Sequence, residues 1–373
     1  MAYSVDDREY MSRALELAAK GRFTTSPNPS VGCVLVVDGA IVGEGHTRPA
    51  GGNHAEVEAL SQAGNQPQST LYVTLEPCCH QGKTGPCTQA IIDANVKRVV
   101  VAAEDPNPQV SGSGIKQLQD AGIDVELGLM EAQARELNQG FYKRHTEGTP
   151  WVTVKMAASL DGRTAMASGQ SQWITSPAAR LDVQRMRAAS CAIITGIGTQ
   201  IMDDPSLTLR ITEQELGVED PVKQPLRVVI DAQLKMATQA RLLQQPGDCL
   251  VATLDGPEQR RKSEALIAAG AEVIFVANNA EHVDLQALLE VLAARDCNQV
   301  MVEAGAGLAG AFVAQGLLDE LVCYWAPKLF GSEARPMFEL PIKTIDAHLA
   351  LSVKDMRQVG EDIKLVLIPD KDY

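Results

Sequence analysis

Hydrophobic and polar positions follow helical and strand periods in turn along the first part of the chain, with turn residues between them. Apolar residues at helical spacing over 6–20 predict a first helix, with Asp6 as candidate N-cap. Asp38-Gly39 is a hairpin turn signal between two apolar runs. The alternation predicts a mixed α/β layer that ends near residue 147. Its further elements are strands over 31–37, 41–44, 71–75, 98–103 and 125–127 and helices over 54–63, 88–95 and 115–121.

The hydrophobic pattern restarts around Glu147–Pro150 and again alternates strands with helices. This predicts a second, mostly parallel sheet flanked by helices. Two closing strands, over 320–330 and 362–368, admit an antiparallel pairing. The motifs differ between the two parts, which therefore predict a fusion of two domains, 1–147 and 148–373, and not a duplication. The elements before the closing strands are strands over 151–156, 191–195, 227–231, 249–253, 272–276 and 299–303 and helices over 177–189, 257–269, 284–295 and from 305 to 315.

Composition excludes some classes of function. The 373 residues carry a net charge of −14, which argues against nucleic-acid binding through a broad basic surface. An anionic substrate must therefore meet a local cluster of Arg or Lys. The N-terminus lacks the basic and apolar regions of a signal peptide, and no apolar run reaches the length of a membrane span. We expect a soluble, cytoplasmic protein without a membrane partner.

The eight cysteines are scattered through a long chain and do not suggest a disulfide framework. Most of those outside the motif described next lie in apolar, strand-like runs, where small buried thiols are common. We expect free thiols in a reducing cytosol. These cysteines are Cys33, Cys191, Cys249, Cys297 and Cys323.

One His and two Cys, His54, Cys78 and Cys87, form a candidate zinc site. Three protein ligands leave the fourth tetrahedral position open, as in catalytic rather than structural zinc sites. Glu56, two residues after the His, is the candidate proton carrier. The order H-x-E…P-C is typical of zinc deaminases, in which the Glu is not a ligand. His54 alone would suit an ordinary surface histidine, and a fourth protein ligand would indicate a structural zinc.

The two candidate cysteine ligands are separated by eight residues, whereas the usual zinc-deaminase spacing is C-x-x-C. The wider spacing, in T-L-E-P-C-C-H-Q-G-K-T-G-P-C (74–87), resembles the deaminase half of the bifunctional riboflavin-biosynthesis enzyme family. P-N-P-S-V-G-C-V (27–34) and G-E-G-H (43–46) extend the resemblance, while Gly85 departs from the family's more frequent T-P-P-C. The resemblance implies a three-layer α/β/α, cytidine-deaminase-like domain with one Zn²⁺ per chain.

The sequence does not decide the roles of three further residues in these motifs. Cys79 is next to the proposed ligand, but Cys78 follows the proline as the motif requires. His80 is a candidate substrate contact or an uninvolved histidine. Asn28, between two prolines, either contacts the pyrimidine or serves the turn.

The second part contains a Gly-rich turn, Glu303–Gly307, after a predicted strand. Such a turn lets backbone N–H groups approach a pyrophosphate, but a tight turn alone explains it equally well. Four further motifs, K-M-A-A-S-L-D-G-R, S-x-W-I-T, T-G-x-G-T and D-D-P-x-L-T-x-R, resemble the reductase half of the same family. That resemblance implies a dihydrofolate-reductase-like fold and NADPH as cofactor.

Carried over to matching positions, the resemblance implies two sets of binding residues. Guanidinium groups suit a dianionic phosphate in an acidic protein, although Arg187 also fits a solvated basic helix face. Lys155 and Asp203 are candidates for polarising the reacting sugar or positioning the nicotinamide. NADPH would contact Ala157, Trp173, Thr199, Asp203, Gly305, Ala306, Gly307, Leu308 and Ala309. The substrate would contact Ser171, Arg187, Leu207, Arg210 and Glu303.

The resemblance implies two successive reactions on a phosphorylated pyrimidine. The first is hydrolytic deamination of 2,5-diamino-6-ribosylamino-4(3H)-pyrimidinone 5′-phosphate with Glu56 as proton carrier. The second is reduction of the ribosyl group of 5-amino-6-(5-phosphoribosylamino)uracil to ribityl. A nucleic-acid base deaminase with an accessory domain is the competing enzyme class, and a binding module with structural zinc is the competing non-enzyme class. We further expect a homo-oligomer, either a dimer or a tetramer.

Overall fold

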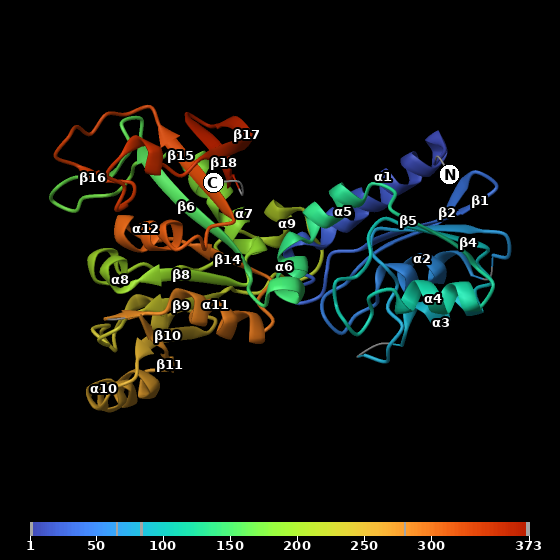
Figure 1. Cartoon of the computed structure of the whole chain (residues 1–373), viewed down its shortest axis with the longest axis horizontal. Helices are drawn as coiled ribbons and strands as arrows, with labels where there is room; N and C mark the ends of the chain where they lie inside the picture. The colour runs from blue at the N-terminus through green and yellow to red at the C-terminus, as the bar shows by residue number, and fades with distance from the viewer. Residues whose placement is uncertain (1–2, 65, 83–84, 280, 371–373) are drawn as a thin grey trace. The chain divides into compact units, whose positions relative to one another are not determined.

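The computed structural model describes residues 3–64, 66–82, 85–279 and 281–370. The chain forms two compact units (Figure 1). The first contains Met1–Gly148 together with Gly217–Val222, and the second contains Thr149–Leu216 and Lys223–Tyr373. Among the described residues, no helix combines the length and the apolar character that a membrane span needs.

The first unit is built on a five-stranded sheet of order β2-β1-β3-β4-β5, antiparallel over β2, β1 and β3 and parallel from β3 to β5. Helices α1 and α5 cover one face, and α2, α3 and α4 cover the other (Figure 1). This confirms the three-layer α/β/α prediction. The elements are α1 Val5–Lys20, η1 Gly21–Phe23, β1 Gly32–Val37, β2 Ala40–His46, α2 Ala55–Ala63, β3 Thr70–Val73, α3 Cys87–Asp93, β4 Arg98–Val101, α4 Ser113–Asp120, β5 Asp124–Leu127, α5 Glu131–Leu137 and α6 Gln139–Glu147.

Glycines let two helices lie directly on this sheet. A Cβ at Gly32 of β1 would come within 1.9 Å of the Ala14 carbonyl oxygen in α1. On the other face, a Cβ at Gly45 of β2 would lie 2.2 Å from the Ala55 oxygen in α2. The absence of side chains at these positions therefore sets the depth at which α2, the helix that follows His54, packs against the sheet.

One prediction for the first unit is wrong, and two of its helices were missed. Asp6 is not the N-cap of α1; Ser4 is, because its side chain accepts the Asp7 N–H and Asp7 accepts the Ser4 N–H in a capping box. Helices α5 and α6 were not predicted. Their apolar residues are few and their charged residues many, so the pattern over 131–147 carries only a weak helical period.

The second unit contains a nine-stranded sheet of order β11-β10-β9-β8-β14-β6-β15-β18-β17. The strands from β11 to β15 pair in parallel, whereas β15–β18 and β18–β17 are antiparallel, as the sequence allowed. The elements are β6 Trp151–Ser159, β7 Arg163–Ala165, α7 Pro177–Ala189, β8 Ala192–Gly196, α8 Ile197–Asp203, α9 Glu213–Leu216, β9 Leu226–Ile230, η2 Arg241–Gln244, β10 Cys249–Leu254, α10 Pro257–Ala268, β11 Glu272–Val276, β12 Asn278–Asn279, β13 His282–Val283, α11 Leu285–Ala294, β14 Gln299–Val302, α12 Ala306–Ala314, β15 Glu320–Ala326, β16 Arg335–Pro336, η3 Ile345–Ala347, β17 Leu351–Val359 and β18 Asp362–Pro369.

Alternate residues of the central strands in the second unit supply two cores. Ile194, Val300 and Val302 pack with residues of α11 and α12 on one face. Ile193 and Met301 pack with Met186 of α7 on the other. Strand β17 was not predicted, because its burial follows no period of two and most of its residues are exposed.

The cysteines bear out the expectation of free thiols. The structure describes all eight and none of them forms a disulfide; of the five outside the zinc motif, four are buried while Cys191 is half-buried.

A buried carboxylate, Asp7, ties α1 to the sheet of the first unit. Its Oδ1 accepts hydrogen bonds from Arg98 (2.7 Å) and from the Tyr72 hydroxyl (2.7 Å). The hydrogen bond from Arg98 is the main cause that holds the pKa of Asp7 below its usual range. A depressed folded-state pKa stabilises the folded unit above the pKa of the unfolded chain, and that contribution is lost as the pH falls toward the folded-state value.

We therefore expect Asp7→Asn to destabilise the first unit by about 1–3 kcal/mol near neutral pH, because Arg98 keeps its charge and loses one of its two anionic partners, while its ion pair with Glu126 remains. The difference from the wild type should hold from pH 7 down to about 4, the ordinary pKa of an aspartate, and shrink as the pH falls further. Hydrogen exchange of the β3 and β4 amides across this range measures it. A difference that is constant with pH would exclude the ionised carboxylate as its source.

Candidate active sites

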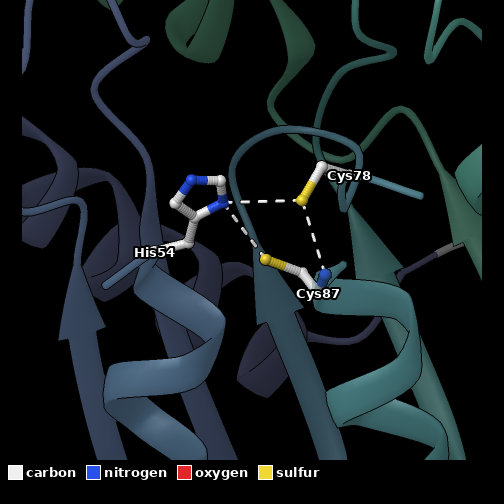
Figure 2. A group of neighbouring side chains, drawn as sticks. All are labelled: His54, Cys78 and Cys87. Carbon is white, nitrogen blue, oxygen red and sulfur yellow. Dashed lines mark hydrogen bonds between the residues drawn. The ribbon is translucent and has the colours of Figure 1, made fainter. Parts of the chain in front are cut away.

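His54, Cys78 and Cys87 meet at one end of the first unit's sheet (Figure 2). His54 is the N-cap of α2, Cys78 lies beyond β3, and Cys87 is the first residue of α3. The His54 Nδ1 is 3.5 Å from the Cys78 Sγ and 3.2 Å from the Cys87 Sγ. The structure thus brings the three candidate ligands together from three separate elements.

The group has the dimensions of a zinc site. Tetrahedral Zn²⁺ with bonds of about 2.0–2.3 Å to N and S places its ligand atoms about 3.5–3.8 Å apart. The three ligand atoms here all lie within 4.8 Å of one another. Among the described residues the group has three members and no fourth protein ligand. The donor set therefore fits a catalytic zinc with one position left for water and argues against a closed structural site.

The two cysteines share a hydrogen bond that separates their pKa values. That bond, with help from His54, lowers the pKa of Cys78 to about 4, and the same bond raises the pKa of Cys87. The Cys87 N–H also donates to the Cys78 Sγ over 3.4 Å. Because zinc is bound by thiolates, a dication at this group would displace thiol protons.

Glu56 lies in the first turn of α2 and is only 3% exposed. Burial raises the pKa of its carboxyl to about 7, and the charge of Cys78 adds to the effect. The carboxyl also hydrogen-bonds with Cys87, so it lies next to a proposed ligand. A carboxyl that titrates near neutral pH can both accept and deliver a proton.

Cys79, His80 and Asn28, whose roles the sequence left undecided, fall outside the ligand group. The Cys79 Sγ faces the Gln109 carbonyl oxygen at 4.0 Å, and His80 is exposed. The Asn28 N–H donates to the Thr25 carbonyl oxygen, which shows that Asn28 belongs to a turn. Sequence reasoning missed Asp105, a buried carboxyl near Cys78 whose pKa burial raises to about 7.

The second unit contains a cavity of about 990 Å³ at the carboxyl edge of its parallel strands. Of the predicted binding residues, Ala309 does not line it, because its side chain is fully buried in the core beneath α12. Lys155 of β6 lines the cavity as well. The predicted residues that line it are Ala157, Ser171, Trp173, Arg187, Thr199, Asp203, Leu207, Arg210, Glu303, Gly305, Ala306, Gly307 and Leu308.

Glu303 is the centre of a charge cluster in this cavity. Arg187 donates to both of its carboxylate oxygens, over 2.6 and 3.1 Å, and the Lys155 Nζ lies 3.3 Å away. Burial acts to raise the pKa of Glu303, but Arg187 and Lys155 outweigh it and lower the pKa to about 2. Arg187 is 9% exposed, so its interpretation as a solvated basic face is wrong.

The glycine turn opens a helix at the cavity. Gly305 is the N-cap of α12, whose first turn presents backbone N–H groups to the cavity, as a pyrophosphate requires. A Cβ at Gly305 would lie 3.9 Å from the Thr199 Oγ1, so the turn after β8 borders the same space. Arg210 lines the cavity with an exposed side chain. These residues fit NADPH and a phosphorylated substrate.

Comparison with known proteins agrees with both sites. The RibD C-terminal domain family matches residues 150–365, and the cytidine and deoxycytidylate deaminase zinc-binding region matches residues 4–103. The riboflavin biosynthesis protein RibD of Escherichia coli K12 is 49% identical over 372 residues, which cover 98% of this chain and 100% of that protein.

Solved structures extend the likeness to the fold. Acinetobacter baumannii RibD (form 1) superposes with a TM-score of 0.90 at 44% identity, over 98% of this chain and 99% of that one. A Thermotoga maritima protein described as a diaminohydroxyphosphoribosylaminopyrimidine deaminase/5-amino-6-(5-phosphoribosylamino)uracil reductase gives 0.84 at 30% identity, with the same coverage. One unit contains a zinc-type ligand group, the other contains a nucleotide-sized cavity, and these relatives match nearly the whole chain. The chain therefore belongs to the RibD family of bifunctional riboflavin biosynthesis enzymes, in which a zinc-dependent deaminase is joined to an NADPH-dependent reductase.

Proposed function

We propose that residues 1–147 deaminate 2,5-diamino-6-ribosylamino-4(3H)-pyrimidinone 5′-phosphate and that residues 148–373 reduce the deaminated product to its ribityl form. The observation that carries the first step is the group of His54, Cys78 and Cys87 with Glu56 buried beside it. The cavity centred on Glu303 supports the second.

In the deaminase, His54, Cys78 and Cys87 would hold the Zn²⁺, which supplies a Lewis acid that makes water nucleophilic at neutral pH. Glu56 takes a proton from the attacking water through its carboxylate. It then delivers that proton to the amino group as the C–N bond breaks, and the second proton of the water passes to the ring nitrogen, so ammonia leaves and a ring carbonyl beside an N–H remains. Burial raises the pKa of the Glu56 carboxyl and so favours the protonated form that delivers a proton, whereas a bound dication would favour the carboxylate that accepts one.

In the reductase, bound NADPH would supply the hydride that reduces the ribosyl C1′ and so converts the ring to the open ribityl chain. Arg210 and Ser171 would bind the substrate phosphate, since Arg187 is already engaged with Glu303. Lys155, whose Nζ lies 3.3 Å from the Glu303 carboxylate, would polarise the reacting sugar. Asp203, which accepts a hydrogen bond from Ser171 (3.4 Å), would orient the nicotinamide end of the cofactor.

The eight free cysteines favour a reducing compartment, and we propose the cytoplasm as the site of both reactions. We also propose a homo-oligomer, a dimer or tetramer, because the edge strand β17 exposes Val353 and Met356. Sedimentation of the purified protein checks the second proposal.

The function is tested by supplying the diaminopyrimidine phosphate with and without NADPH. We expect ammonia release in both cases and NADPH oxidation only after deamination. Ammonia release without subsequent NADPH oxidation would remove the second step, and the absence of ammonia release from zinc-loaded protein would remove the first.

Glu56→Gln should retain zinc and lose deamination by about 10²–10⁴-fold, because the ligands are intact while the proton carrier is neutralised. Metal analysis and ammonia release on one preparation measure both properties. Glu9→Gln, an exposed change of the same kind on α1, is the matched control. Near-normal ammonia release by metal-replete Glu56→Gln would exclude the role.

Cys78→Ser and Cys87→Ser should each weaken zinc binding, since a serine hydroxyl is a poor substitute for a thiolate. Cys79→Ser should leave the metal content nearly unchanged, because its sulfur lies outside the ligand group. Zinc content after dialysis against a chelator checks all three. Zinc loss from Cys79→Ser with retention by Cys78→Ser would mean that the assigned ligand is the wrong member of the pair.

Arg210→Ala should weaken substrate binding in the reductase by about 1.5–3 kcal/mol, the cost of a lost charged hydrogen bond. Deamination should continue at close to the wild-type rate, and NADPH should still bind through the turn after Glu303. Arg261→Ala, an exposed change on α10, is the control. Ammonia release, NADPH affinity and NADPH oxidation are measured together.

Two outcomes would contradict this assignment of Arg210. Loss of ammonia release by a folded, zinc-loaded Arg210→Ala protein would show that the two sites are coupled. Unchanged KM and kcat in the reductase would place Arg210 outside the substrate site.

A further inference from the structure

Glu76 lies between β3 and the proposed ligand Cys78, and its carboxylate is 3% exposed. Each oxygen accepts two backbone N–H groups. Oε1 accepts those of Gly114 (2.9 Å) and Ile115 (3.1 Å), and Oε2 accepts those of Gly112 (3.0 Å) and Asp105 (3.2 Å). The side chain of one residue thus replaces the backbone partners of four others.

Three of the four donors belong to the start of α4. Gly112 is its N-cap, and Gly114 and Ile115 lie in its first turn, where backbone N–H groups have no partner within the helix. The negative charge of Glu76 also suits the positive end of the helix dipole. The fourth donor, Asp105, follows β4. Glu76 therefore joins the chain before Cys78 to two segments that are distant in sequence.

The backbone next to Cys78 is held from several sides. A Cβ at Gly114 would lie 2.1 Å from the Pro77 carbonyl oxygen, so α4 packs directly against the residue that precedes the ligand. The Glu76 N–H donates to the Ala103 carbonyl oxygen (2.9 Å), and the Thr88 N–H donates to the Cys78 carbonyl oxygen (3.2 Å). With the backbone fixed on both sides, the Cys78 sulfur has little freedom of position.

We infer that Glu76 is the positioning residue of the metal centre. It fixes the Pro77–Cys78 backbone against α4 so that the Cys78 sulfur stays 3.5 Å from the His54 Nδ1. This inference rests on the proposed ligand set. A carboxylate is required because four N–H donors converge on it, whereas an amide offers one oxygen and would direct its own NH₂ at two of the donors.

The test uses the full chain with Glu76→Gln. Zinc affinity is measured by competition with a chelator, and the Co²⁺-substituted protein is examined by absorption spectroscopy, whose thiolate and ligand-field bands report ligand geometry. We expect zinc affinity to fall about 10–100-fold, as for other residues that orient a ligand, with altered Co²⁺ bands and a lower kcat for ammonia release. Reductase activity on the same preparation should be unchanged and shows that the rest of the chain is folded.

Asp7→Asn is the matched control, because Asp7 is a buried, hydrogen-bonded carboxylate of the same unit that contacts no proposed ligand. It should lower the stability of the unit and leave the Co²⁺ bands unchanged. Gly114→Ala is the second variant, which keeps the carboxylate and displaces Pro77. It should alter the Co²⁺ bands as Glu76→Gln does, and it keeps the test decisive if Glu76→Gln fails to fold.

Wild-type zinc affinity and Co²⁺ bands in Glu76→Gln, or in Gly114→Ala where Glu76→Gln does not fold, would overturn the inference. Equal spectral changes in Asp7→Asn would reduce Glu76 to a general contribution to stability. A failure of the ligand set itself gives a different result, because Cys78→Ser would then keep the thiolate bands of the wild type.

Discussion

A buried carboxylate needs hydrogen-bond donors for its oxygens in place of water. At both sites, buried carboxylates with such donors hold the surrounding helices and strands together. Glu76 accepts four backbone N–H groups and joins the chain before Cys78 to α4. Glu303 accepts both arms of Arg187 and faces Lys155. Because a buried charge without partners costs several kcal/mol, each of these groups enforces one arrangement of the elements that supply its donors. The geometry of both sites therefore depends on these hydrogen bonds.

Glu56 is the contrasting case. Glu56 is as buried as Glu76, and burial raises the pKa of Glu56 to about 7. In Glu303, by contrast, the neighbouring Arg187 and Lys155 lower the pKa of the carboxyl to about 2. The same side chain therefore serves two purposes. With its donors supplied, it is a fixed charge that holds structure; without them, it exchanges a proton near neutral pH. A bound dication would lower the pKa of Glu56, whereas burial raises it. The carboxylate form would therefore remain available to accept a proton.

The two sites meet their ligands by different means. In the deaminase unit, three ligands converge from the N-cap of α2, the loop after β3 and the start of α3, and glycines that let α2 lie against β2 set that convergence. In the reductase unit, the parallel strands β6, β8 and β14 end at a common edge, where the helices α8 and α12 begin (Figure 1). Backbone N–H groups and a few cations there line a cavity large enough for a dinucleotide.

The sequence by itself determined the alternation of strands and helices, the three candidate zinc ligands, Glu56 and part of the cavity lining, because each depends on local period or on a motif that resembles those of the family. It could not determine the partners of the carboxylates. Glu303 and Arg187 are 116 residues apart, and Glu76 and Gly114 are 38 apart, and no periodicity links such positions. It also missed α5, α6 and β17, whose patterns are weak, and it placed Ala309 at the cofactor although packing of α12 buries that side chain. Only the tertiary structure decides which distant donors meet a buried charge, since the choice is made by the packing of whole elements and not by their sequences alone.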